Sequence, residues 1–124
     1  MKVFKINEAK PDARNNLEIY KLDALELKGL NLQLVYHLPG QKMDGKAPKE
    51  HTLFIISGEL TITSSVTGTF VVGPGDAIHY KEGDERVLEN TSKQKTGVLL
   101  IDTAPNQGGA GGPGGPGGLP PFVK

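Results

Sequence analysis

Apolar and polar residues alternate along much of the chain with a period of two, which is the period of a β-strand. The alternation is clearest in residues 25–28 (Leu-Glu-Leu-Lys) and 30–34 (Leu-Asn-Leu-Gln-Leu), and Gly29 separates these runs at an expected bulge or bend. Such a pattern places one set of side chains on the buried face of a sheet. Further strands are predicted over residues 3–6, 17–22, 35–38, 52–57, 59–63, 67–72, 77–80, 85–89 and 97–102.

Turn-forming residues separate these predicted strands. Pro39-Gly40 and Ser57-Gly58 are two such turns, and residues 73–76 (Gly-Pro-Gly-Asp) and 82–84 (Glu-Gly-Asp) form two more. No stretch spaces its apolar residues convincingly at three and four positions, as a helix requires. Many short strands with regular turns therefore predict an all-β sandwich or barrel.

Charge and composition narrow the classes of function. The 124 residues have a formal net charge of zero and include no cysteine, which excludes disulfides, thiolate zinc sites and cysteine nucleophiles. Lysines are scattered among acidic residues, so the sequence predicts neither a nucleic-acid partner nor a membrane surface. No apolar run approaches the roughly 20 residues of a membrane span, and residues 1–6 lack the apolar core of a signal peptide. We therefore expect a cytoplasmic protein.

The composition changes after Asp102, where glycine triplets fill residues 108–119. We expect a folded domain over residues 1–104 and a Gly/Pro-rich C-terminal tail over residues 105–124. Glycine loses the most backbone entropy on ordering and has no side chain to bury, which favours a disordered tail. The alternative is an extended run over residues 108–118 that brings the apolar segment Leu119–Val123 against the barrel or a second subunit.

A pattern of glycines and one asparagine runs through the middle of the chain. Sixteen residues separate Gly58 from Gly75, and Gly83 and Asn90 follow at fixed spacings. From Gly40 to Asn90 the sequence resembles the two-motif signature of the cupin superfamily. The resemblance covers roughly half the chain and implies a double-stranded β-helix (jelly-roll) barrel over residues 1–104. It also implies a homodimer and a small ligand at the barrel mouth.

The metal ligands of the cupin motifs do not carry over. Lys46 and Pro48 stand where the resemblance places two histidines, and His51 falls at the glutamate position, with one residue fewer before Gly58. Arg86 replaces the third metal histidine, and a guanidinium offers only donors. A first-row metal requires three or four imidazole or carboxylate ligands. We therefore expect no metal and no other cofactor.

Arg86 and His51 are the main candidates for a functional site. The resemblance places Arg86 inside the barrel, where its charge needs a carboxylate partner or an anionic ligand. The alternatives are a structural ion pair with Glu50, Glu59 or another acid, and an arginine whose charged end extends to the barrel mouth. His51 shares a strand face with Leu53, and it is either a pocket acid or base or a histidine at the barrel rim.

Other candidates complete the predicted site. The expected ligand-binding residues are Arg86, His51, His79, Met43 and Tyr80, although Met43 could instead fill a gap in the packing. The three histidines His37, His51 and His79 could also converge on a rebuilt metal site.

Three functions remain open from the sequence. The first is a metal-independent cupin that binds a small, anionic molecule, as a sensor or a carrier. The second is an enzyme, either an isomerase or lyase with His51 as its catalytic base or a metal enzyme with a rearranged histidine site. The third is a structural or interaction module whose pocket is closed by its own side chains Phe54, Tyr80 and Arg86 and whose C-terminal tail mediates assembly. The identity of the ligand does not follow from the sequence.

Overall fold

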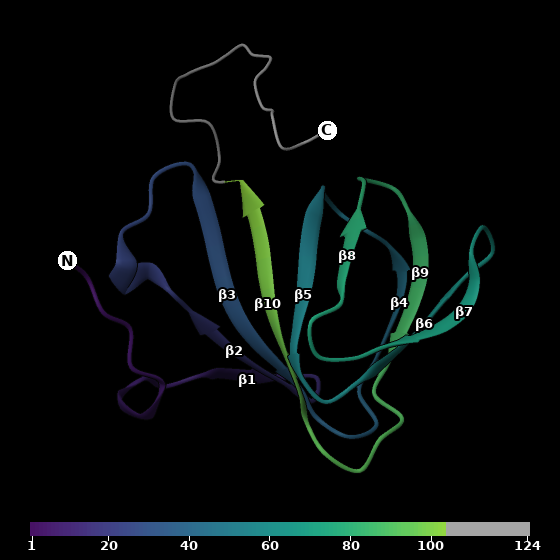
Figure 1. The fold of residues 1–124 in the computed structure, drawn as a ribbon, viewed down its shortest axis with the longest axis horizontal. Coiled ribbons are helices and arrows are strands. Elements are labelled where there is room, and N and C mark those ends of the chain that lie inside the picture. Colours follow the sequence, from purple (N-terminus) through teal and green to yellow (C-terminus); the bar gives the residue numbers. More distant parts are fainter. Residues whose placement is uncertain (104–124) are drawn as a thin grey trace.

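A computed structural model describes residues 1–103 as two antiparallel β-sheets (Figure 1). The larger sheet has the strand order β1-β2-β3-β10-β5-β8, and the smaller sheet has the order β4-β9-β6-β7. The strands are β1 (Asp12–Arg14), β2 (Leu17–Lys21), β3 (Leu30–His37), β4 (Lys42–Lys46), β5 (His51–Ser57), β6 (Leu60–Ser64), β7 (Gly68–Val72), β8 (Ala77–Tyr80), β9 (Glu85–Glu89) and β10 (Thr96–Thr103). The prediction of an all-β fold is confirmed.

The core lies between the two sheets. Leu53 and Ile55 of β5 and Val98 of β10 face Leu60 of β6 and Leu88 of β9 in one buried cluster. Each of these residues is at most 4% exposed, so the alternation of side chains assigns the inner face of each strand. This settles the orientation of β5, whose two faces are both apolar in the sequence.

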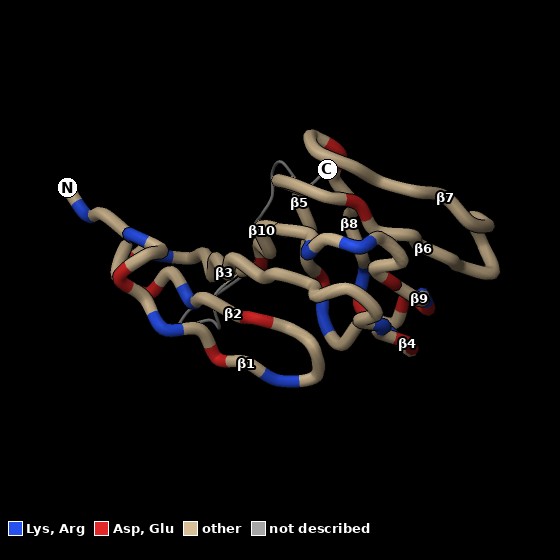
Figure 2. The backbone as a smooth tube through the Cα atoms, turned by 90° about the horizontal axis from the view of Figure 1, so that it is seen from below, with Lys and Arg blue, Asp and Glu red and all other residues tan. Residues whose placement is uncertain are grey.

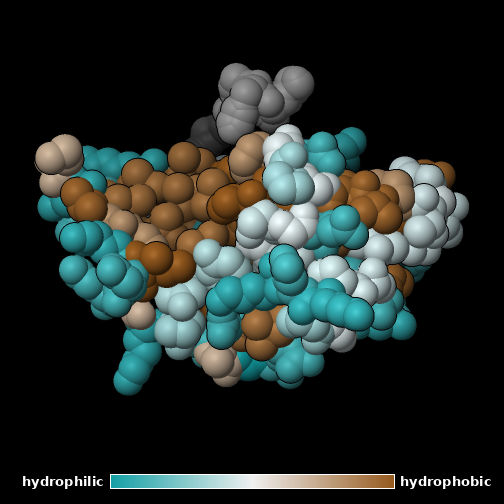
Figure 3. Space-filling view, turned by 60° about the horizontal axis from the view of Figure 1, so that its bottom comes forward, coloured by the Kyte–Doolittle hydropathy of each residue, from teal (hydrophilic) through white to brown (hydrophobic). Residues whose placement is uncertain are grey.

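The outer face of the larger sheet is also apolar. Phe54 and Ile56 of β5 point away from the core and are 40% and 48% exposed. Leu99 of β10 lies on the same outer face because it pairs with Phe54 and with Leu34. Figure 3 shows hydrophobic side chains gathered over the left half of the molecule, where Figure 1 places β3 and β10.

The predicted strands differ from the observed ones mainly near the N-terminus. Residues 3–6 and 25–28 were predicted as strands, but short 3₁₀ turns at Ile6–Glu8 and Asp23–Leu25 occupy or adjoin these segments. The predicted ranges 30–34 and 35–38 form the single strand β3. The prediction missed β1 and β4, whose residues are mostly polar and therefore show no apolar alternation. Gly29 does bend the chain, with φ of 80°.

Two residues of the cupin-like motifs, Gly58 and Asn90, stabilise connections between strands. Gly58 lets the chain approach Thr96 so closely that an added Cβ would lie 2.6 Å from the Thr96 hydroxyl. That hydroxyl donates to the Glu59 carbonyl at 2.6 Å and accepts from the Glu59 amide at 3.0 Å. Asn90 is fully buried, and its amide donates to the carbonyls of His37 and Gln94, both at 2.8 Å.

The C-terminal tail lies outside the described residues. The expected extended run over residues 108–118, the docking of Leu119–Val123 and the domain boundary at residue 104 therefore stay predictions. Within residues 1–103, no helix has the length and apolar character needed to cross a membrane.

Candidate functional site

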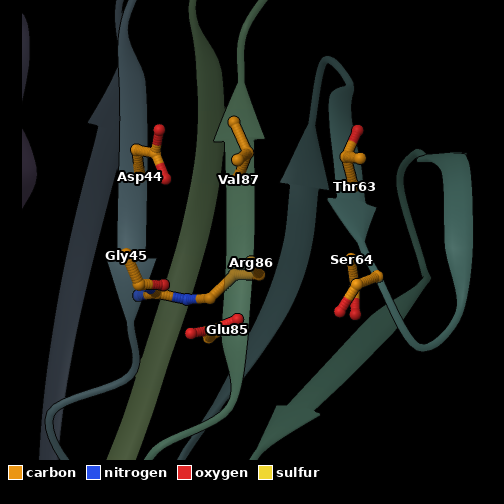
Figure 4. Close-up of a pocket in the computed structure, with 8 residues that line it drawn as sticks. Asp44, Gly45, Thr63, Ser64, Glu85, Arg86 and Val87 are labelled. Atoms are coloured by element: carbon orange, nitrogen blue, oxygen red, sulfur yellow. The ribbon is translucent and has the colours of Figure 1, made fainter.

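Arg86 is a buried cation at the centre of the candidate site. It lies on β9 opposite Gly45 of β4, and the whole residue is 8% exposed. Its Nη1 donates to the Gly45 carbonyl oxygen at 2.8 Å, while its buried Nε has no hydrogen-bond partner within residues 1–103. Figure 4 shows the side chain running from β9 to the backbone of β4 at Gly45.

The charge of Arg86 is not neutralised by a carboxylate in the described part of the chain. None of the ion pairs between residues 1–103 includes it. Glu50, one of the two expected partners, instead lies 2.8 Å from His79. The structural ion pair considered as an alternative is therefore not formed here.

Tyr80, on the inner face of the larger sheet, lies against Arg86 of the smaller sheet, and His51 lies beside Tyr80. The Arg86 Cζ is 5.1 Å from the centre of the Tyr80 ring, which is a cation–π contact. The Tyr80 and His51 rings lie 5.2 Å apart because the two residues pair across β5 and β8. Burial raises the pKa of the Tyr80 phenol, and the charge of Arg86 opposes the rise. The phenol oxygen is buried without a hydrogen-bond partner among the described residues.

Two open cavities reach Arg86. The first, which we call the hydroxyl-lined cavity, has a volume of about 300 Å³ and is drawn in Figure 4. It is lined by Asp44, Gly45, Thr63, Ser64, Ser65, Glu85, Arg86 and Val87. The second, which we call the cationic groove, has a volume of about 480 Å³. It is lined by Asn15, Leu17, Gln41, Lys42, Met43, Asp44, Lys46, Pro48 and Arg86.

The two cavities lie on opposite sides of β4. The hydroxyl-lined cavity uses residues of β9 and β6, which follow β4 in the smaller sheet. The cationic groove uses Asn15 and Leu17 from the β1–β2 hairpin, which lies on the other side of β4 (Figure 2). Three cationic side chains and one carboxylate line the groove, so its lining carries a net positive charge.

The structure brings some of the predicted site residues together and separates others. Arg86, Tyr80 and His51 form one cluster, and Met43 lines the cationic groove as expected. His51 lines neither of these two cavities, and the expected void shared by His51 and Arg86 stays a prediction. Phe54 lies on the outer face of the larger sheet and therefore does not face the barrel interior, contrary to the third hypothesis.

His79 points away from the barrel interior, against the prediction. It pairs with Thr52, whereas its neighbour Tyr80 pairs with His51, so the alternation of the strand turns it to the outer face. There its Nε2 lies 2.8 Å from a Glu50 carboxylate oxygen and its Nδ1 lies 2.9 Å from the Thr52 hydroxyl. These contacts make His79 part of a surface cluster.

The three histidines do not converge. His37 is buried at the end of β3, where its Nδ1 lies 3.0 Å from the Gln41 amide oxygen. Burial lowers the pKa of His37, and the contact with Gln41 offsets part of this effect. Residues 1–103 contain no group of three His, Cys, Asp or Glu side chains arranged to hold a metal ion. The donors present at the position of the cupin metal therefore do not fit one, because Arg86 stands among them.

The sequence prediction missed most residues of the two cavities. Lys42 and Lys46 belong to the unpredicted strand β4, and Asn15 lies in the turn between the unpredicted strand β1 and the predicted strand β2. Gln41 is 3% exposed and Met43 is half-buried, in phase with Gly45. The alternation of these inward positions with outward ones could have indicated β4. It was missed because the inward residues are an amide, a thioether and a glycine instead of aliphatic side chains.

Comparisons with known proteins identify the fold. No family model matches the sequence, and no curated protein matches it. Among solved structures, the polyketide cyclase RemF from Streptomyces resistomycificus is similar with a TM-score of 0.69 and 20% identity, over 85% of this chain and 82% of that one. A cupin-superfamily sugar phosphate isomerase from Silicibacter pomeroyi has a TM-score of 0.68 and 17% identity, over 83% and 76% of the two chains.

A Cupin 2 conserved barrel domain protein from Salinispora arenicola has a TM-score of 0.69 and 14% identity, over 82% of this chain and 87% of that one. The chain therefore has the cupin fold, as the motif pattern predicted. At these identities the similarity identifies the fold alone.

Proposed function

We propose that this protein binds a small anionic molecule in the cationic groove, with the Arg86 guanidinium as the anchor. The observation that carries the proposal is a buried cation without a carboxylate partner within residues 1–103. A buried charge without a partner is costly. An anionic ligand would supply that partner, and Lys42 and Lys46 would strengthen its attraction to the groove.

The size and lining of the groove suit a small organic anion. Its volume of about 480 Å³ falls within the range of roughly 300–1,000 Å³ that is typical of small-molecule sites. Leu17, Met43 and Pro48 offer apolar contacts to the body of a ligand. The amides of Asn15 and Gln41 can donate and accept hydrogen bonds beside them.

Calorimetric titration with acetate, hexanoate and inorganic phosphate, at constant ionic strength, tests the proposal. The key variant is Arg86→Met, which keeps an unbranched side chain and removes the charge. The matched control is Arg14→Met, because Arg14 is the other arginine of the sequence and its side chain is 61% exposed.

We expect at least one of these anions to bind the wild-type protein. Truncating one partner of a buried charge pair costs about 2–5 kcal/mol, so Arg86→Met should weaken binding by roughly thirtyfold or more. Arg14→Met should leave it unchanged. Equal binding by wild type and Arg86→Met, or no binding of any of the three anions, would overturn the proposal.

The contact of His51 with a backbone carbonyl favours a second candidate function, proton-transfer catalysis. The His51 Nδ1 lies 2.8 Å from the Lys49 carbonyl oxygen. A carbonyl can only accept, so Nδ1 carries the proton and Nε2 of the neutral ring keeps a lone pair that can act as a base. The phenol of Tyr80, which has no hydrogen-bond partner within residues 1–103, is a potential proton donor beside it.

Exchange of carbon-bound hydrogen in heavy water, followed by NMR on each carboxylate that binds, separates catalysis from binding. An enzyme of this kind should exchange a hydrogen next to the carboxylate, and His51→Gln should lose the exchange while still binding. His79→Gln is the control, because His79 lies on the outer face. Absence of exchange in every bound carboxylate would leave binding as the function.

A further inference from the structure

The outer face of the larger sheet is apolar across the neighbouring strands β3, β10 and β5. Leu99 of β10 pairs with Leu34 of β3 and with Phe54 of β5, and Ile101 of β10 pairs with Leu32 of β3. Paired residues point to the same side of a sheet, so their side chains form one continuous surface. We call this surface the apolar face, and it comprises Leu32, Leu34, Phe54, Ile56, Leu99 and Ile101.

The apolar face is open to solvent within residues 1–103. Phe54 and Ile56 are exposed, and the other four side chains are partly exposed. The outward positions of β3, β10 and β5 carry no charged side chain, and Figure 3 shows the hydrophobic surface that results. A contiguous apolar patch of this kind marks a surface that binds another apolar group.

The sequence that follows β10 contains such a group. β10 lies between β3 and β5 in the sheet and ends at Thr103. The residues beyond it lie outside the described part of the chain, and among them the segment Leu119–Val123 reads Leu-Pro-Pro-Phe-Val. Its three apolar side chains match the chemistry of the apolar face. Its two prolines have a fixed φ, so the segment loses little backbone entropy when it binds.

The linker between β10 and this segment is long enough to reach the apolar face. Fifteen residues, 104–118, separate Thr103 from Leu119, and a glycine-rich chain of that length spans about 21 Å on average. Thr103 and Leu99 are four residues apart on β10, which is a distance of about 13 Å. A short tether gives a local concentration on the order of 1 mM. A second copy of the chain at about 10 µM is roughly a hundredfold less concentrated, which favours the chain's own segment as the occupant.

We propose that Leu119–Val123 binds the apolar face of its own chain. Phe122 contacts Phe54 and Leu99 at the centre of that face. This contact is separate from the proposed anion site, because Arg86 lies against the inner face of the larger sheet and the apolar face is the outer one. The segment protects the apolar face, and a second copy or another apolar partner must displace it before binding there.

A spin label next to the segment tests this contact in the full chain. The sequence has no cysteine, so Lys124→Cys provides a single attachment site for a nitroxide. The label should cause a loss of the methyl NMR signals of Leu34 and Leu99. The methyl signals of Val66, in the exposed turn between β6 and β7 of the other sheet, should keep their intensity.

Two substitutions in the labelled chain test the role of the apolar segment. Phe122→Ser should restore the signals of Leu34 and Leu99, because it removes the largest apolar side chain of the segment. The matched control is Asn106→Ser, a polar substitution in the linker, which should leave the loss of signal unchanged. Undiminished signals of Leu34 and Leu99 in the labelled chain, or a loss that Phe122→Ser does not reverse, would overturn the proposal.

A mixed sample distinguishes the chain's own segment from that of a second copy. Isotope-labelled chains without nitroxide are mixed with an equal amount of nitroxide-bearing chains without isotope. The signals of Leu34 and Leu99 should stay intact in this mixture, because the contact is intramolecular. Their loss in the mixture would show that the segment binds a second copy, which would also overturn the proposal.

Light scattering tests whether a second copy occupies the apolar face directly. A dimer that Phe54→Ser separates and Phe122→Ser leaves intact would assign the face to that copy and contradict our proposal. Phe70→Ser is the matched control, because Phe70 lies on β7 of the other sheet and is 38% exposed, close to the value for Phe54. We expect all three variants to have the same oligomeric state as wild type at 10 µM or below.

Discussion

Replacing Arg86 with methionine should separate stability from binding. The wild-type side chain gains about 1.5–3 kcal/mol from a hydrogen bond with a charged donor, here to the Gly45 carbonyl. Its cation–π contact with Tyr80 contributes about 0.5–2 kcal/mol. Holding an ion out of water costs several kcal/mol in return. These terms nearly cancel, so we expect the free energy of unfolding of ligand-free Arg86→Met to lie within about 2 kcal/mol of wild type.

An anionic ligand should stabilise the folded state only where Arg86 is present. At a free concentration of one hundred times its Kd, a ligand stabilises the folded state by about 2.7 kcal/mol. For a domain of this size that corresponds to a rise in Tm of roughly 10 °C. Thermal unfolding followed by circular dichroism, with and without the anion, should show the rise in wild type and Arg14→Met and lose it in Arg86→Met. A ligand-free variant destabilised by more than about 4 kcal/mol would make Arg86 a structural residue. An undiminished rise in the variant would show that Arg86 is not the anchor.

Three further predictions concern the fold and its assembly. Because the folded pKa of His37 is lowered, its contribution to stability is present above the unfolded value of 6.5 and is lost as the pH falls through the folded pKa. In urea unfolding, the free energy of unfolding should therefore fall less between pH 7.5 and 5 for His37→Gln than for wild type or His79→Gln. An equal fall in all three proteins would contradict this. Gly58→Ala should destabilise the protein by about 2–4 kcal/mol from backbone strain and overlap with Thr96. The control Gly75→Ala, with a similar positive φ and nothing within 4 Å of its Cβ, should lose only about 1–2 kcal/mol. If the expected homodimer uses the outer face of the larger sheet, Ile56→Lys should yield monomers in light scattering while Val66→Lys, in the exposed β6–β7 turn, leaves the dimer intact.

The sequence predicted the fold well because the fold depends on strand alternation and turns. The core strands β5 and β6 carry aliphatic residues on their inner faces and were predicted from them, whereas β9 contributes Leu88 beside Arg86 and was predicted with the help of the turns around it. Gly58 and Asn90 also marked their positions, because close approach and buried hydrogen bonding restrict which residues fit there.

The candidate site was only partly predictable, since it is built from elements without apolar alternation. Arg86 was found because a charge stands at an inward position of a recognisable motif. Strand β4, which pairs with the strand of Arg86, was missed. Lys42 and Lys46 lie on β4, so they were missed as residues of the cationic groove. His79 was misplaced because the sequence does not fix the register of β8 against β5, and a shift of one residue exchanges the two faces.

The geometry around Gly45 explains how a cation can be kept inside this barrel. Arg86 lies directly opposite a glycine on an edge strand, so its long side chain can reach the backbone carbonyl of β4 without meeting another side chain. The carbonyl and the face of the Tyr80 ring stabilise the positive charge in part, and neither of them neutralises it. A carboxylate in the same place would remove the attraction for an external anion. The positive charge of buried Arg86, which its protein contacts stabilise only in part, is therefore the feature that links the stability of the fold to the binding that we propose.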